Sequence, residues 1–105
     1  MPPESPTYVV IFISQRTPGD NGYGAMAQRM VEGVAKFNGY LDSDSVRDET
    51  GLGITVSYWR SLDDIANWKA DAEHQTAQRL GKEEWYQRIH LTVAKVEKDA
   101  HWTKP

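Results

Sequence analysis

Cysteine is absent from this 105-residue chain, and so are several other features that mark common protein classes. Without cysteine the chain forms no disulfide and offers neither a thiolate nucleophile nor a thiolate ligand for zinc or an iron–sulfur cluster. Basic residues form no run, and the net charge is −3. The positive surface that nucleic acid binding requires is therefore missing, and we predict no nucleic acid partner.

Long apolar segments are also missing. The longest apolar run, residues 8–13, is far shorter than the roughly 20 residues that span a bilayer. The polar, proline-rich residues 1–7 lack the basic region and apolar core of a signal peptide. We therefore expect no membrane association and a cytoplasmic location.

Paired metal ligands are the third absence. His74, His90 and His101 lie far apart, and no His-x-His or His-Glu-x-x-His motif occurs. Metal sites built on histidine normally use such close spacings, so we predict no metal site.

The chain is instead rich in large aromatic rings over residues 54–86. Three of its four tryptophans, Trp59, Trp68 and Trp85, fall in this part. Tryptophan brings a large apolar area and an indole N–H that needs a partner. The concentration indicates either an unusually aromatic core or the wall of a ligand pocket.

The order of predicted elements is β-α-β-β-α-β. Strands are predicted at residues 8–13, 40–47, 52–59 and from about 85 to 96, with turn residues at 48–51. Helices are predicted from residue 23 to Asn38-Gly39, and over residues 62–80 between a Ser61 cap and Gly81. We predict one domain over residues 1–105, with its core in residues 7–98. Its fold class is α+β and ferredoxin-like, a four-stranded antiparallel sheet with both helices on one face.

The other face of this sheet is predicted to be too apolar for water. Residues 8–13 are apolar at every position, and the third strand places Ile54, Val56 and Tyr58 on one side and Trp59 on the other. A second copy of the chain is the simplest cover. We therefore expect a homodimer whose two sheet faces close into a barrel.

Several segments carry a family resemblance. They are Gly53-Ile-Thr-Val-Ser-Tyr-Trp59, Trp68-Lys69, Ala72-Glu-His74, Ala77, Gly81, Trp85-Tyr86 and Val93-Ala-Lys-Val96. With them, residues 8–96 resemble the antibiotic biosynthesis monooxygenase family of the dimeric α+β barrel superfamily. The resemblance implies a pocket between helices and sheet that holds a small, flat aromatic molecule.

The resemblance also bears on cofactors. In quinone-forming members the carbanion of the substrate activates oxygen without flavin, metal or haem, which implies no protein-bound cofactor here. In haem-degrading members a late helical histidine ligates iron and a nearby tryptophan buckles the porphyrin. Trp68 matches that tryptophan, but the ligand position falls at Gln78 and His74 lies one turn earlier. This departure disfavours haem.

Seven residues are the candidate site, and each has a structural alternative. Trp68 is either pocket wall or core, and Trp59 contacts the open sheet face or a second subunit. His74 is a candidate proton acceptor, although helix geometry points it away from the apolar stripe. Tyr58 is a stacking wall. Tyr58 and Tyr86 are also phenols that can donate to a substrate oxygen, or else packing residues. Tyr86, Arg88 and His90 share one face of the last strand, because they are spaced two residues apart. In the functional interpretation Arg88 and His90 hold an anion, and His90 can also accept a proton. In the structural interpretation all three form a polar network at the barrel seam.

The functional prediction is a cofactor-independent monooxygenase acting on a small aromatic or polyketide-like compound. One alternative is a non-catalytic dimer that binds a small molecule or has a structural role, with an aromatic cluster that merely completes a core. This alternative predicts a cavity below about 300 Å³. The other is a haem-binding or haem-degrading monooxygenase.

Overall fold

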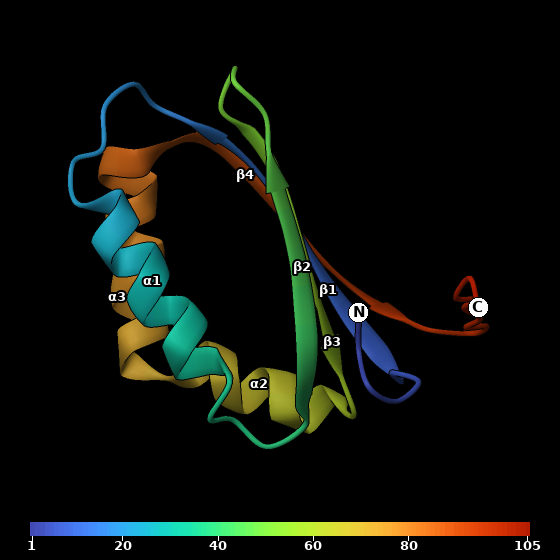
Figure 1. Cartoon of the computed structure of the whole chain (residues 1–105). Helices are drawn as coiled ribbons and strands as arrows, with labels where there is room; N and C mark the ends of the chain where they lie inside the picture. The colour runs from blue at the N-terminus through green and yellow to red at the C-terminus, as the bar shows by residue number, and fades with distance from the viewer.

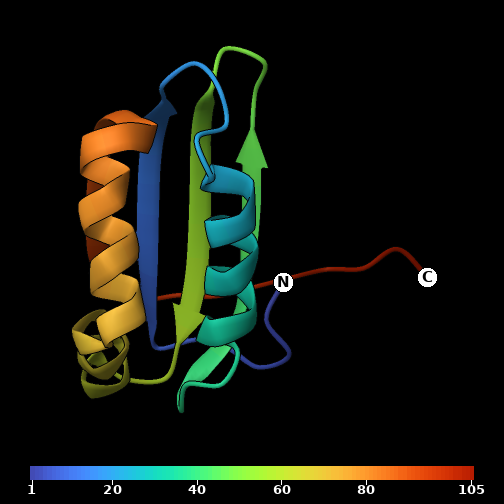
Figure 2. The same cartoon turned by 90° about the vertical axis from the view of Figure 1, so that its left-hand side faces the viewer.

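The chain forms a four-stranded antiparallel sheet with its helices packed on one face, as the computed structural model shows (Figures 1 and 2). The structure describes the backbone of residues 1–105 and the side chains of residues 1–71 and 74–105. The elements, in chain order, are β1 (Tyr8–Arg16), α1 (Tyr23–Val34), β2 (Tyr40–Arg47), β3 (Leu52–Trp59), α2 (Leu62–Ala70), α3 (Ala72–Leu80), the π-helical turn η1 (Gly81–Trp85) and β4 (Tyr86–Lys95).

The strand order confirms the predicted ferredoxin-like fold class. The strands lie in the order β2-β3-β1-β4, and each neighbouring pair is antiparallel. The β-branched residues of β1 occupy a central position, where both faces of a strand are available for packing. Both strands of the β2–β3 hairpin have the predicted bounds, and β1 continues past Ile13 to Arg16.

Short polar side chains start the first two helices. Before α1, the Asp20 carboxylate accepts the backbone N–H of Gly22 at 3.2 Å and of Gly24 at 3.0 Å. Before α2, Ser61 Oγ accepts the Asp64 backbone N–H at 3.1 Å, as predicted. These bonds satisfy N–H groups that have no partner inside the helix.

The second helical segment is broken at Asp71, so the predicted single helix over residues 62–80 is wrong. Asp71 has extended backbone angles (φ −61°, ψ 135°), and its N–H bonds the Trp68 carbonyl oxygen at 3.1 Å. Asp71 Oδ2 then accepts the His74 backbone N–H at 3.2 Å and so caps α3. Because of the break, the side chains of α3 point in other directions than they would if α2 simply continued.

The most buried core lies at the α2 end of the sheet. Val10, Trp59 and Ile65 are almost fully buried, with Tyr40, Trp68 and other partly buried side chains packed around them. Trp59 has no exposed surface, and its Nε1–H donates to Ser57 Oγ at 2.9 Å. The prediction that Trp59 contacts the open sheet face or a second subunit is therefore wrong, because its ring lies under the helices.

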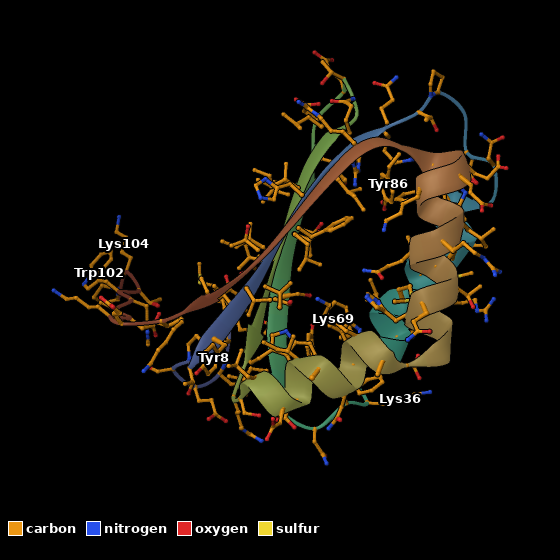
Figure 3. The ribbon with its side chains drawn as sticks, turned by 180° about the vertical axis from the view of Figure 1, so that it is seen from behind. Tyr8, Lys36, Lys69, Tyr86, Trp102 and Lys104 are labelled. Carbon is orange, nitrogen blue, oxygen red and sulfur yellow. The ribbon has the colours of Figure 1, made fainter. Side chains whose placement is uncertain are left out.

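The opposite sheet face carries no helix (Figure 1). Val10 points to the helices, so strand alternation directs Val9, Ile11 and Ile13 to this open face. Ile13 pairs with Ile54 of β3, which is 40% exposed. The open face therefore carries an apolar strip along β1 and β3, and no helix covers it. The segment after β4, with Trp102 and Lys104, extends away from the sheet (Figure 3).

Candidate functional site

A cavity of about 280 Å³ lies between the sheet and the helices. Val10, Phe12, Thr55 and Ser57 of β1 and β3 form its floor. Met26 and Met30 of α1 line it opposite the sheet, and α3 contributes His74, Ala77 and Gln78. This volume is just under the roughly 300 Å³ at which ligand pockets begin, which meets the condition set by the non-catalytic alternative.

Trp68 and His74 lie against each other in the lining of this cavity. Their ring centroids are 4.1 Å apart, and the planes are inclined by 44°. Trp68 also packs on Trp59, at 5.3 Å between centroids, so it joins the core to the cavity. The sequence left open whether Trp68 belongs to the core or to the pocket wall, and in the structure it belongs to both.

The polar atoms of this pair are buried without a protein partner. Among the described side chains, the buried nitrogen and oxygen atoms that lack a hydrogen bond are Trp68 Nε1 and both ring nitrogens of His74. His74 is only 7% exposed. Buried polar groups are nearly always hydrogen-bonded in native proteins, so these three atoms need a partner, either water or a bound molecule.

His74 points into the cavity because of the break at Asp71. Continuation of α2 would have placed His74 on the opposite side, as the sequence predicted. Because α3 starts afresh after the break, the ring of His74 instead faces Trp68. The prediction that His74 faces away from the apolar stripe is therefore wrong.

The protonation of His74 is set by burial. Desolvation lowers the pKa of His74 below its usual 6.5, with Asp71 raising it and Lys69 lowering it to smaller extents. The imidazole is thus neutral at pH 7, with one N–H donor and one nitrogen acceptor. A neutral imidazole is the form that can accept a proton from a ligand.

The other end of the cavity is closed by Tyr23, Trp85 and Tyr86. Tyr86 packs edge-to-face on Phe12 at 5.7 Å and on Tyr23 at 5.9 Å between centroids. Its ring lies in the arch between sheet and helices (Figure 3). Burial, and then Tyr23, raise the pKa of Tyr86, so its phenol stays protonated.

The turn η1 sets the position of the Tyr86 ring. A Cβ on Gly81 would lie 2.9 Å from Tyr86 Cε2, so only glycine leaves room for the ring. Thr17 Oγ1 donates to the Glu84 carbonyl oxygen at 2.8 Å, and Trp85 Nε1–H donates to the Asn21 carbonyl oxygen at 2.9 Å. These bonds tie the loop after β1 to η1 and close this end.

Tyr58 lies on the open face and not at the cavity. Its hydroxyl donates to Asp44 Oδ2 at 2.8 Å, on the side of β3 opposite Trp59. Burial, with a smaller contribution from Asp44, raises the pKa of Tyr58 to about 12. The predicted stacking role in the pocket is therefore wrong for Tyr58.

Arg88 and His90 also lie on the open face. Their partners in β1 are Gln15 and Ile13, and the register shifts between Gln15 and Arg16, where Tyr86 pairs. This irregularity places Tyr86 on the helix side and leaves Arg88 and His90 exposed on the other side. The predicted shared face of the three residues is therefore wrong, and neither Arg88 nor His90 lines the cavity.

Sequence reasoning missed several residues that do line the cavity. Gln78 follows His74 by four residues on α3, a spacing that puts two helical side chains on one face. Tyr23 and Tyr40 line it from α1 and β2. Two signals pointed to Gln78: the family resemblance, which places the haem-ligand position there, and its helical spacing from His74. The spacing became useful only once His74 was known to face inward.

Two further features concern metals and membranes. Within the described residues, no three His, Asp or Glu side chains come together in a group that would hold a metal ion. In the same residues, no helix has the length and apolar character needed to cross a membrane.

Fold and cavity together define an α+β protein with an aromatic pocket enclosed between sheet and helices. Residues 6–80 match the profile of the family described as Antibiotic biosynthesis monooxygenase. A Bacillus subtilis (strain 168) protein, described as uncharacterized protein YqjZ, is 47% identical over 96 residues, which is 91% of this chain and 84% of that protein. The chain belongs to the antibiotic biosynthesis monooxygenase family.

More distant matches include proteins named as oxygenases. Jasmonate monooxygenase ABM from Pyricularia oryzae is 24% identical over 92 residues, which is 85% of this chain but 43% of that protein. Among solved structures, SnoaB, a cofactor-independent oxygenase from Streptomyces nogalater, has a TM-score of 0.76 at 7% identity, covering 90% of this chain and 97% of that one. Rv0793 from Mycobacterium tuberculosis has a TM-score of 0.77 at 14% identity, covering 90% and 98%. These two structures share the fold.

Proposed function

We propose that this protein is a monooxygenase that oxidises a small aromatic or polyketide-like molecule in the cavity, without a protein-bound cofactor. One observation carries the proposal: Trp68 Nε1 and both nitrogens of His74 are buried at the cavity and have no partner among the described residues. Family membership and the cofactor-independent oxygenase SnoaB support it.

His74 is the proposed proton acceptor, and Trp68 is the proposed donor to a substrate oxygen. Neutral His74 takes a proton from a phenol or enol, and the indole N–H stabilises the oxyanion that forms. The electron-rich ring carbon then transfers electrons to molecular oxygen. A methylene carbon becomes a carbonyl carbon, and the second oxygen atom leaves as water with the two hydrogens of that methylene.

Tyr86 is the proposed end wall for the substrate ring. Its phenol lies in the arch beside Phe12 and Tyr23, and it stays protonated. The apolar surroundings exclude water from the reacting carbon, which protects a carbanion from protonation. Arg88 and His90 have no role in this proposal, because neither lines the cavity.

We also propose a homodimer formed through the open sheet faces. Val9, Ile11 and Ile13 alternate onto that face with no helix above them. Apolar patches of this kind mark interaction surfaces, and a twofold dimer buries the same patch on both copies.

A non-catalytic small-molecule-binding dimer is the second candidate. This candidate includes a structural dimer whose aromatic cluster merely completes the core, and it requires a cavity below about 300 Å³. The cavity of about 280 Å³ meets that condition by a small margin. Haem remains disfavoured, since Gln78 stands at the position where haem-degrading relatives have the ligand histidine, and an amide is not a haem ligand. Hemin titration tests haem directly, because a histidine-ligated complex shifts the Soret band and His74→Ala would abolish that shift.

Oxygen uptake with a panel of hydroquinones and anthrones tests the proposed activity. We expect uptake by the wild type and a decrease of about 100-fold or more in His74→Ala, since general base catalysis contributes roughly 10² to 10⁴. His90→Ala is the matched control and keeps the wild-type rate. No uptake with any compound, or equal loss in both variants, would contradict the proposal.

A further inference from the structure

We propose that the cavity binds an uncharged molecule carrying a hydroxyl group beside a carbonyl oxygen, and that it rejects carboxylates. This inference rests on the proposed function, because it concerns the same cavity, and it names the class of substrate. It is carried by the charges and the hydrogen-bond partners of the described lining residues.

The lining offers no counter-ion to an anion. Among its described side chains there is no Asp, Glu, Lys or Arg, and His74 is neutral because burial lowers its pKa. The arginines near the Tyr86 end are already engaged. Arg47 donates to Ser14 Oγ and the Gly51 carbonyl oxygen, and Arg16 donates to the Trp85 and Gly19 carbonyl oxygens. An unpaired carboxylate here would lose its hydration without compensation.

The hydroxyl groups of the β2 and β3 floor are paired among themselves. Ser45 Oγ lies 2.7 Å from Thr55 Oγ1, and Tyr40 Oη lies 2.8 Å from Ser43 Oγ. Ser57 Oγ accepts the indole N–H of Trp59. These groups make the floor polar but leave no buried atom that requires a ligand.

The unmet hydrogen bonds are concentrated at Trp68 and His74. Trp68 Nε1–H is a donor, and neutral His74 supplies one donor and one acceptor. Since the two ring centroids are only 4.1 Å apart, one small group of ligand atoms can reach both rings. The ligand therefore needs an acceptor and a donor side by side. A carbonyl with a neighbouring hydroxyl supplies both, whereas a carboxylate supplies acceptors alone.

Anaerobic calorimetric titration at pH 7 tests this inference without turnover. The probes share one ring system: hydroxyacetylnaphthalene, acetylnaphthalene without the hydroxyl, and hydroxynaphthoic acid, which is a carboxylate at this pH. We expect hydroxyacetylnaphthalene to bind about tenfold more tightly than each of the other two, the effect of one well-made hydrogen bond or one unpaired charge. Trp68→Phe should remove the N–H but keep a ring, and lower the affinity for both ketones.

His74→Phe should abolish the preference for the hydroxylated ketone. Overturning results are equal or tighter binding of the acid, an unchanged preference in His74→Phe, or failure of all three probes to bind at millimolar concentration. Tight binding of the acid with proton uptake by the protein would also overturn the inference, because His74 would then act as a cation. Circular dichroism of both variants establishes that each is folded.

The outcome is separable from that of the proposed function. If the binding preference holds but no hydroxylated ketone drives oxygen uptake, the ligand class stands and the oxygenase activity fails. If oxygen uptake occurs with carboxylates as well as with neutral compounds, the activity stands and the ligand class fails.

Discussion

At the scale of residues, the account depends on a buried pair of rings whose nitrogens lack protein partners. His74 supplies the acceptor, and Trp68 supplies the donor and links the cavity to the core through Trp59. The sequence nominated both residues because of their chemistry. It could not exclude Tyr58, Arg88 and His90, because strand alternation fixes which residues share a face but not which face the helices cover.

The stability of the protein should depend on pH through His74. Burial lowers the folded-state pKa below 6.5, so the unfolded chain binds the proton more readily and stability rises with pH in this range. We expect the stabilisation to be fully present above pH 6.5 and to be lost as pH falls through the lowered pKa. Urea unfolding at pH 7.5 and at acid pH measures this.

His74→Gln is the matched control for that pH dependence, since it keeps a polar side chain without a titrating group. Its unfolding free energy should vary less between the two pH values than that of the wild type. An equal pH dependence in both proteins would show that His74 is not held in its neutral form.

At the scale of elements, the main difference from the sequence-based prediction is the break at Asp71. The stretch from Leu62 to Leu80 has helix-forming composition, and no glycine or proline interrupts it. The break depends on Trp68 packing against Trp59 and on the Asp71 side chain taking the His74 N–H in place of a helical carbonyl. Tertiary packing outweighed local propensity, which sequence spacing does not report.

The register shift between β1 and β4 is a second feature that local sequence patterns did not predict. The sequence alternates regularly from Tyr86, which predicted one face for Tyr86, Arg88 and His90. The register shift between Gln15 and Arg16 moves Tyr86 to the cavity side. The strands and the fold class were predictable because hydrophobic alternation and turn residues are local signals, whereas a one-residue shift is decided by what η1 packs against.

Asp71→Ala should destabilise the protein and impair the site together. Loss of the cap on α3 costs about 1 kcal/mol, and the His74 ring loses its fixed direction. We expect a lower unfolding midpoint in urea and weaker binding of the neutral probe. Asp71→Asn keeps a capping oxygen and should restore both quantities to near the wild-type values. If Asp71→Asn is fully stable but still binds the probe weakly, Asp71 does not act by positioning His74 through its cap.

At the scale of the whole molecule, one sheet face carries the cavity and the other is open. The helices lie over the first (Figure 2). On the second, Ile54 is 40% exposed and Val46 is 72% exposed, in positions paired across β2 and β3. The proposed homodimer covers these residues, because a second copy supplies a self-complementary surface.

Ile54→Lys should convert the proposed dimer into monomers, because it places a charge in the centre of an apolar interface. Sedimentation velocity at micromolar concentration measures the change. Leu62→Lys is the control, since Leu62 is 51% exposed at the start of α2, away from the sheet face. A wild-type protein that sediments as a stable monomer would contradict the dimer while leaving the cavity intact.

The most direct test of the central claim, that Trp68 and His74 together bind the substrate, is a crystal structure with hydroxyacetylnaphthalene under anaerobic conditions. The account predicts the ring in the cavity between α1 and the sheet, with its two oxygens about 3 Å from Trp68 Nε1 and a His74 ring nitrogen. A ligand bound only on the open sheet face would contradict it. So would a structure in which other protein groups hydrogen-bond the ring nitrogens of both Trp68 and His74.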